Sequence, residues 1–118
     1  MIKDQLIYVA HPFGGNKDKA NKYSINTIME NLVMLDKNNT YLSPLHNFSM
    51  LCFDTQYSKG LKICLDMLNR CDALVLCGDW ETSKGCIGEW SFAIAKGMPI
   101  YTWKEWTDKL KEQGDNSR

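Results

Sequence analysis

Residues 72–102 read DALVLCGDWETSKGCIGEWSFAIAKGMPIYT, and this pattern predicts a strand, a polar loop, a helix and a second strand in succession. The first strand is predicted over residues 72–77, and its side chains after Asp72 are apolar at successive positions, which is typical of a strand covered on both faces. The helix is predicted over residues 85–96, and Gly97 is suited to end it in a left-handed conformation. The second strand is predicted over residues 98–102. Strand, helix and strand in this order predict a parallel pair joined by a crossover helix.

The same alternation extends to the rest of the chain. Residues 6–10 (LIYVA) form a short apolar run that predicts a strand, and residues 17–37 follow at helical spacing. The remaining candidates are a strand at 40–43, a helix at 55–70 and a final helix that carries Trp103, Trp106 and Leu110. The order β-α-β-α-β-α-β-α predicts a three-layer α/β/α fold, flavodoxin- or Rossmann-like, whose parallel sheet has about four to five strands.

The candidate core follows from these elements. Apolar residues of the predicted strands are expected to be buried, namely Ile7, Val9, Leu74, Val75, Leu76 and Ile100. Helical periodicity predicts an inward face on the first helix, made of Ala20, Tyr23, Ile28, Leu32 and Leu35.

Composition limits the classes of protein that the chain can belong to. Of its 118 residues 44 % are hydrophobic, which supports one domain over residues 1–113 followed by a disordered polar tail at 114–118. Basic and acidic residues number 14 each, so the formal net charge is zero, and neither polymeric nucleic acid nor a membrane surface is expected as a partner. The chain has no apolar run of the ~20 residues that a membrane span requires, and its start lacks the apolar stretch of a signal peptide. We therefore expect a cytoplasmic protein.

The cysteines form an odd set without a CxxC pair. Disulfide frameworks of secreted proteins favour even numbers, and zinc sites favour close pairs. Reduced core thiols are therefore expected, and an isolated functional thiol such as Cys64 is the alternative. We expect no metal and no cofactor. The cysteines are Cys52, Cys64, Cys71, Cys77 and Cys86.

Ligands of parallel α/β sheets bind at the carboxyl ends of the strands, so the loops at that edge are the candidate site. Residues 11–16, HPFGGN, follow the first strand. Paired glycines before a helix let backbone N–H groups approach an anion, although they also suit a plain turn. The loop lacks GxGxxG and GxxxxGKS/T, which argues against a dinucleotide site or a P-loop. The candidate binding residues here are His11, Pro12, Phe13, Gly14, Gly15 and, after the second strand, His46.

The loop after the third strand supplies further candidates. Gly78 and Asp79 lie at the same edge of the sheet, and Ser83 is a suitable N-cap for the helix that follows. Gly85 and Gly88 leave the first turns of this helix without side chains on one side, so a ligand has room to approach.

Glu89 lies in the second turn of that helix, where the helix dipole favours the ionised carboxylate by roughly 0.3–1 kcal/mol. An ionised carboxylate suits a nucleophile or a base, whereas a lone helical glutamate more commonly lies on a solvated face. Tyr8 in the first strand can direct its hydroxyl towards the same layer, although a buried tyrosine with a satisfied hydroxyl is the commoner case. Asp72 starts its strand and is expected at the opposite end of the sheet.

Three segments resemble the nucleoside 2-deoxyribosyltransferase-like superfamily, in particular its 2′-deoxynucleoside 5′-phosphate N-hydrolase-like members. They are LIYVAHPFGG at 6–15, DALVLCGD at 72–79 and SKGCIGEWSFAIAKGMPIY at 83–101. The nearest branch comprises short bacterial and phage proteins described as a domain of unknown function. The resemblance covers roughly residues 5–102 and implies a parallel α/β fold.

The resemblance also implies roles for individual residues. Glu89 corresponds to the nucleophile that attacks C1′ of deoxyribose, so that the base departs and a glycosyl-enzyme intermediate forms. Tyr8 corresponds to a tyrosine that positions the carboxylate or the sugar. Ser83, six residues before Glu89, stands where relatives that take 5′-phosphates have serine. Relatives carry an Asp in the second helix that serves the leaving base, and the corresponding residue here is Cys64. Either Asp79 takes the acid role, or base departure is unassisted, or the protein binds nucleotides without cleaving them.

The resulting expectation is an enzyme that hydrolyses or transfers at the N-glycosidic bond of 2′-deoxynucleosides or their 5′-monophosphates. The first alternative is a non-catalytic nucleotide-binding protein, a sensor or a sponge. The second is a protein-interaction module that uses an exposed stripe of Trp103 and Trp106. The expected partners are a small-molecule nucleoside or nucleotide and further copies of the chain, in a homodimer or higher homo-oligomer with the last helix at the interface.

Overall fold

The computed structural model describes residues 4–12, 18–44 and 57–116. Its strands form a four-stranded sheet in the order β2-β1-β3-β4, and every neighbouring pair is parallel. The predicted α/β class and the flavodoxin- or Rossmann-like parallel sheet are confirmed. In chain order the elements are β1 (Leu6–Ala10), α1 (Asp18–Leu35), β2 (Thr40–Leu42), α3 (Tyr57–Leu68), β3 (Ala73–Leu76), the 3-10 helix η2 (Trp80–Thr82), α4 (Lys84–Lys96), β4 (Ile100–Thr102) and α5 (Trp103–Asn116).

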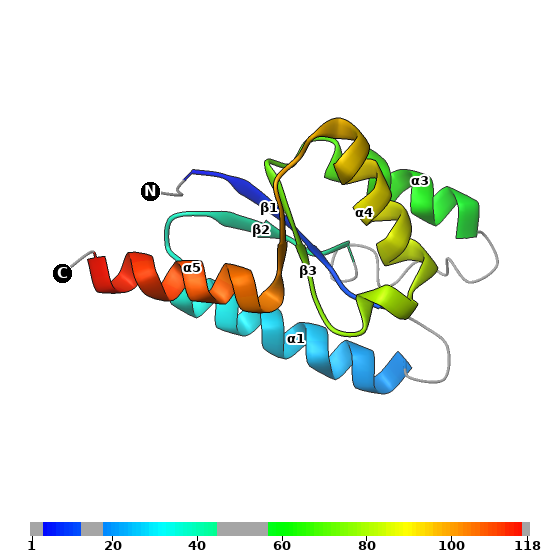
Figure 1. Cartoon of the computed structure of the whole chain (residues 1–118). Helices are drawn as coiled ribbons and strands as arrows, with labels where there is room; N and C mark the ends of the chain where they lie inside the picture. The colour runs from blue at the N-terminus through cyan, green and yellow to red at the C-terminus, as the bar shows by residue number, and fades with distance from the viewer. Residues whose placement is uncertain (1–3, 13–17, 45–56, 117–118) are drawn as a thin grey trace.

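Helices cover both faces of the sheet (Figure 1). α1 and α5 lie on one face, and α3 and α4 lie on the other. Side chains alternate along β1, so this strand contributes to a separate core on each face. The core under α1 and α5 contains Ile7, Val9, Ile25, Leu32, Ala73, Val75, Cys77 and Trp106. The core under α3 and α4 contains Tyr8, Ala10, Leu68, Cys71, Leu74, Leu76, Cys86, Ala93 and Met98.

β3 is the most enclosed strand, and all of its residues are buried. It pairs with β1 on one side and β4 on the other, which explains why its sequence is apolar at successive positions. The predicted core residues of β1 and β3 are buried as expected. Ile100 is only half-buried, because β4 lies at the edge of the sheet.

The inward face predicted for α1 is partly wrong. Leu32 is buried as expected, but Tyr23 is 76 % exposed and Leu35 is 60 % exposed. The buried face instead includes Ile25, which lies about 200° around the helix from Tyr23. Ile28 packs against the same core from a half-buried position.

β4 passes directly into α5 through a capping box. The backbone N–H of Glu105 donates to Thr102 Oγ1 over 3.3 Å, and the backbone N–H of Thr102 donates to Glu105 Oε1 over 2.9 Å. This leaves no loop after β4 at the carboxyl edge of the sheet. At its other end α5 continues to Asn116, into the 114–118 segment for which a tail was expected.

A hydrogen-bonded cluster around Asp36 joins α1, β2 and α5. The buried carboxylate accepts from the hydroxyl of Tyr41, from the side-chain amide of Asn39 and from the backbone of Asn38. Trp106 Nε1 donates to the same Tyr41 hydroxyl over 3.0 Å. Burial, followed by the bond to Asp36, raises the pKa of Tyr41, so the phenol remains a donor.

The tryptophans of α5 belong to the core. Trp106 is fully buried, and the half-buried Trp103 packs against the same cluster. The prediction of an exposed stripe of Trp103 and Trp106, which a protein-interaction module would use, is therefore wrong. Within the described residues, no helix combines the length and the apolar character that a membrane crossing demands.

We expect Tyr41→Phe to lower the free energy of unfolding by about 1–3 kcal/mol, because it leaves a buried carboxylate and an indole N–H each short of a partner. Chemical denaturation measures the change. Tyr101→Phe is the matched control, since Tyr101 contacts Trp106 through its ring at 5.0 Å between centroids. Equal losses in the two variants would mean that the cluster contributes nothing specific.

Candidate functional site

The carboxyl ends of β1 and β3 lie side by side at the point where the strand order reverses. The chain passes from β1 to β2 on one side, and β3 lies on the other. Ala10 is in register with Leu76, and the backbone N–H of Cys77 extends the pairing by donating to the Ala10 carbonyl over 2.9 Å. In open parallel sheets ligands bind outside the carboxyl ends of the strands, where the strand order reverses.

Tyr8 and Glu89 meet between the sheet and α4. Tyr8 projects from β1 into the core under α3 and α4, and its hydroxyl donates to Glu89 Oε2. Tyr8 is fully buried and Glu89 is only 7 % exposed. Glu89 therefore does not lie on a solvated helix face, and its carboxyl is held at one defined place beside the sheet.

Burial dominates the electrostatics of this pair. It raises the pKa of Glu89 from 4.5 to about 7, and the hydrogen bond from Tyr8 opposes the rise. The expectation that the helix dipole favours an ionised Glu89 is outweighed, because the dipole acts mainly within the first turn while desolvation acts on the whole carboxyl. Burial, and then the neighbouring Glu89, raises the pKa of Tyr8, so its hydroxyl keeps the proton. Near neutral pH the carboxyl therefore exists in both forms.

Cys64 of α3 completes the cluster. Its half-buried thiol lies close enough to interact with the Tyr8 hydroxyl and, electrostatically, with Glu89. Burial, followed by Glu89, raises the pKa of the Cys64 thiol. The structure thus brings Cys64, Tyr8 and Glu89 together from three different elements.

The other cysteines are buried thiols. Burial raises the pKa of Cys77 and Cys86 to about 12 and that of Cys71 to about 11, so each is protonated and unreactive near neutral pH. All four cysteines of the described ranges are unpaired by disulfides, and Cys52 lies outside those ranges. Across residues 4–12, 18–44 and 57–116, no group of three or more His, Cys, Asp or Glu side chains is arranged to hold a metal ion.

Ser83 acts as the N-cap of α4. Its hydroxyl oxygen accepts from the backbone N–H of Cys86 over 3.3 Å, as predicted for a cap. Gly85 is half-buried in the first turn. Gly88 faces α3, because a Cβ at this position would lie 3.6 Å from Leu61 Cδ1, an ordinary contact distance. Packing alone therefore does not require glycine at 88.

His11 is buried at the end of β1, on the side of the sheet covered by α1. Nδ1 lies 2.8 Å from the Pro12 carbonyl oxygen and Nε2 lies 2.9 Å from Ser24 Oγ. Gly78, in a left-handed conformation with φ of 61°, lies against the same ring. Nothing in the sequence marked Ser24, which stands on a helix without a motif.

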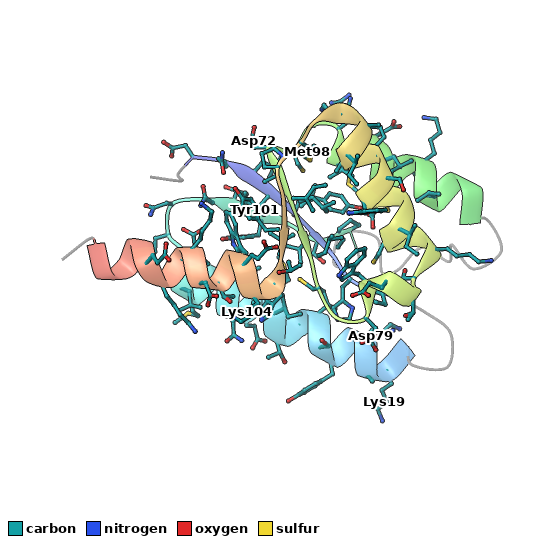
Figure 2. The ribbon with its side chains drawn as sticks, viewed as in Figure 1. Lys19, Asp72, Asp79, Met98, Tyr101 and Lys104 are labelled. Carbon is teal, nitrogen blue, oxygen red and sulfur yellow. The ribbon has the colours of Figure 1, made fainter. Side chains whose placement is uncertain are left out.

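The two aspartates lie at opposite ends of the sheet (Figure 2). Asp72 accepts from the backbone N–H of Leu6 over 2.8 Å at the amino end, as expected for a residue that starts its strand. Asp79 lies at the carboxyl end, and its backbone carbonyl accepts from the backbone N–H of Thr82. The Asp79 side chain is exposed, whereas the cluster of Tyr8, Glu89 and Cys64 is shielded. Of the other predicted binding residues, Pro12 is buried after His11. Four lie outside the described residues, namely Phe13, Gly14, Gly15 and His46.

We expect Gly88→Ala to raise the free energy of unfolding by about 0.5–1 kcal/mol, since alanine is the better helix former and its methyl group has room beside Leu61. Gly97→Ala is the contrasting control, because φ of 77° at that helix end disfavours any side chain. If Gly88→Ala destabilises the protein as Gly97→Ala does, the α3–α4 contact is tighter than described.

We expect Glu89→Gln to stabilise the protein increasingly as pH rises from 4.5 to about 7. The folded state holds the Glu89 proton to higher pH than the unfolded state, so the burial penalty is absent below pH 4.5 and complete above about pH 7. At about 1.4 kcal/mol per pKa unit the gain at pH 8 is roughly 3 kcal/mol.

Denaturation curves of both proteins at several pH values measure this gain. Glu30→Gln on the exposed side of α1 is the control for the substitution itself. A stability difference between Glu89→Gln and wild type that does not change with pH would show that the Glu89 carboxyl is solvated in solution.

Comparison with protein-family models matches residues 5–102 to the family described as Domain of unknown function (DUF4406). The match spans most of the chain, including every strand and the helix that carries Glu89, and the chain therefore belongs to this family. Comparison with curated proteins finds no match.

Proposed function

We propose that this member of the DUF4406 family hydrolyses or transfers at the N-glycosidic bond of a 2′-deoxynucleoside or its 5′-monophosphate, with Glu89 as the nucleophile. The observation that carries the proposal is the buried hydrogen bond from Tyr8 of β1 to Glu89 of α4. A carboxyl that is desolvated and held by a phenol is costly for the fold, and such groups concentrate at functional sites. The segments around both residues also resemble the nucleoside 2-deoxyribosyltransferase-like superfamily.

In the proposed reaction an oxygen of the ionised Glu89 attacks C1′ of the sugar. The C1′–N bond breaks and its electron pair leaves with the base, which takes up a proton from solvent water, while the sugar remains on Glu89 as an ester. Water, or an N–H nitrogen of a second base, then attacks C1′, gives up a proton to solvent, and releases the carboxylate as the ester C1′–O bond breaks. Two displacements at one carbon retain the configuration at C1′.

Tyr8 has a positioning role in this scheme. Its hydroxyl holds Glu89 Oε2 and leaves Oε1 as the attacking oxygen, and its raised pKa keeps it a donor throughout. The bond also lowers the pKa of Glu89 against the effect of burial, which increases the ionised fraction near neutral pH.

A 5′-phosphate on the substrate is supported by the start of α4. Ser83 is only half-buried there, and the first N–H groups of a helix favour an anion. The hydroxyl oxygen of Ser83 already caps Cys86, so its contribution to a phosphate would be its O–H as a donor.

A nucleotide-binding protein without turnover is the second candidate, and Cys64 favours it. The residue beside Tyr8 and Glu89 is a protonated thiol, where the superfamily has an aspartate that serves the leaving base. A thiol with a raised pKa is a poor proton carrier for that task near neutral pH.

Base release from the four 2′-deoxynucleosides and their 5′-monophosphates, followed by chromatography, separates the two candidates. For an enzyme, we expect Glu89→Gln to reduce base release by at least ~100-fold and to change ligand affinity by less than about tenfold, because the amide keeps the shape and loses the nucleophile. Sugar covalently bound at Glu89, detected by mass spectrometry, would support the mechanism directly.

The pH profile supplies the control. We expect kcat/KM to rise with pH up to about 7 as Glu89 ionises, and Tyr8→Phe to move this rise to higher pH because the bond that lowers the pKa is lost. If wild type releases no base but binds the monophosphates, the binding role stands and the enzyme proposal fails. If Glu89→Gln alters neither base release nor ligand affinity, the assignment of the site is wrong.

A further inference from the structure

The ring of His11 connects the end of β1 to α1. A carbonyl oxygen can only accept, so Nδ1 carries a proton and donates it to Pro12. In the neutral ring Nε2 then accepts from the hydroxyl of Ser24 on α1. Both ring nitrogens are occupied within the protein, which leaves neither for a ligand.

The same ring also lies against the turn after β3. A Cβ added to Gly78 would stand 2.8 Å from Nε2 and 3.2 Å from Cε1 of His11, closer than side chains normally approach. The backbone at Gly78 therefore packs directly against the edge of the His11 imidazole. Its left-handed conformation also suits glycine.

The turn after β3 leads into α4 through the 3-10 helix η2. The backbone N–H of Thr82 donates to the Asp79 carbonyl over 3.0 Å, and the Trp80 ring of η2 lies 5.9 Å between centroids from the Trp90 ring of α4. Trp90 is the neighbour of Glu89. Gly78 is thus connected to the part of α4 that carries the carboxyl by a short segment that has a hydrogen bond and a ring contact of its own.

We propose that His11 is a positioning residue, whose imidazole spaces the turn at Gly78 from α1 and thereby holds α4 and Glu89 against Tyr8. His11 acts through Gly78 and does not touch the ligand. Any effect of His11 on catalysis or on nucleotide affinity rests on the proposed function. The effect of His11 on the position of Glu89 does not depend on that function.

A double-mutant cycle tests the contact. Gly78→Ala is expected to reduce the equilibrium constant for folding by about tenfold or more when His11 is present. In the His11→Ala background the reduction should be smaller by about threefold or more, because the ring that the methyl group would strike is gone. The cost of the left-handed φ is common to both backgrounds and cancels. Equal reductions in the two backgrounds would overturn the contact.

Two conservative variants test the action on Glu89. His11→Gln places an amide oxygen near the position of Nε2, where it can accept from Ser24 and lie against Gly78. His11→Asn reaches only the position of Nδ1 and leaves the space at Gly78 open. The readout is the titration of the Glu89 carboxyl carbon by NMR, identified by its loss in Glu89→Gln.

The Gln variant is expected to keep the wild-type midpoint near pH 7, and the Asn variant to lower it by about half a unit or more as water reaches Glu89. Unchanged midpoints in both variants would reduce His11 to a purely structural role and overturn the inference. Neither readout needs a substrate, so a wild type that releases no base would end the proposed enzyme function and leave this test intact. In an active wild type, base release should fall with Asn and be restored with Gln.

Discussion

β1 and β3 pair at the centre of the sheet, and each strand has one set of side chains facing α1 and α5 and another facing α3 and α4. Both cores therefore depend on this pair staying in register, since a shift by one residue would exchange the two faces. The same register places Tyr8 under α4 and His11 beside α1. The candidate site is thus a consequence of the central pairing as much as of its own residues.

Glu89 is a buried polar group, and the desolvation of its carboxyl lowers the stability of the fold. An alanine or glutamine at the same place would avoid the desolvation that raises the pKa of the carboxyl. Local features that weaken the fold are expected where function requires them, and the surrounding contacts of β3 and α4 supply the compensation. That balance distinguishes Glu89 from the cysteines nearby, which are buried as neutral thiols and cost the fold little.

The sequence allowed the strands, the caps of α4 and the burial of β3 to be predicted, because each has a strong local signal. Ser83 and Gly97 bound a helix by residue type alone, and they do so in the structure. The inward face of α1 could not be read correctly, since apolar residues such as Tyr23 and Leu35 stand around much of its circumference and tertiary contacts choose among them.

Two residues of the candidate site, Glu89 and Tyr8, could be proposed from position and resemblance. Whether the Glu89 carboxyl is solvated could not be predicted, because it depends on how closely α4 packs on the sheet. The contact between His11 and Gly78 could not be foreseen, because it joins residues far apart in the chain that no periodicity relates. Sequence patterns predict local geometry, whereas the desolvation of a side chain such as Glu89 depends on how the helices pack on the sheet.

A carboxyl whose pKa lies at about 7 has a further consequence for any ligand of the site. A ligand that favours one form of Glu89 must release or take up a fraction of a proton when it binds, and the fraction is appreciable only when the pH of the solution lies close to that pKa. The buffer then supplies or accepts these protons. The heat of binding would include the ionisation heat of the buffer in proportion to that fraction, so calorimetry in two buffers of different ionisation heat would count the protons that accompany the ligand.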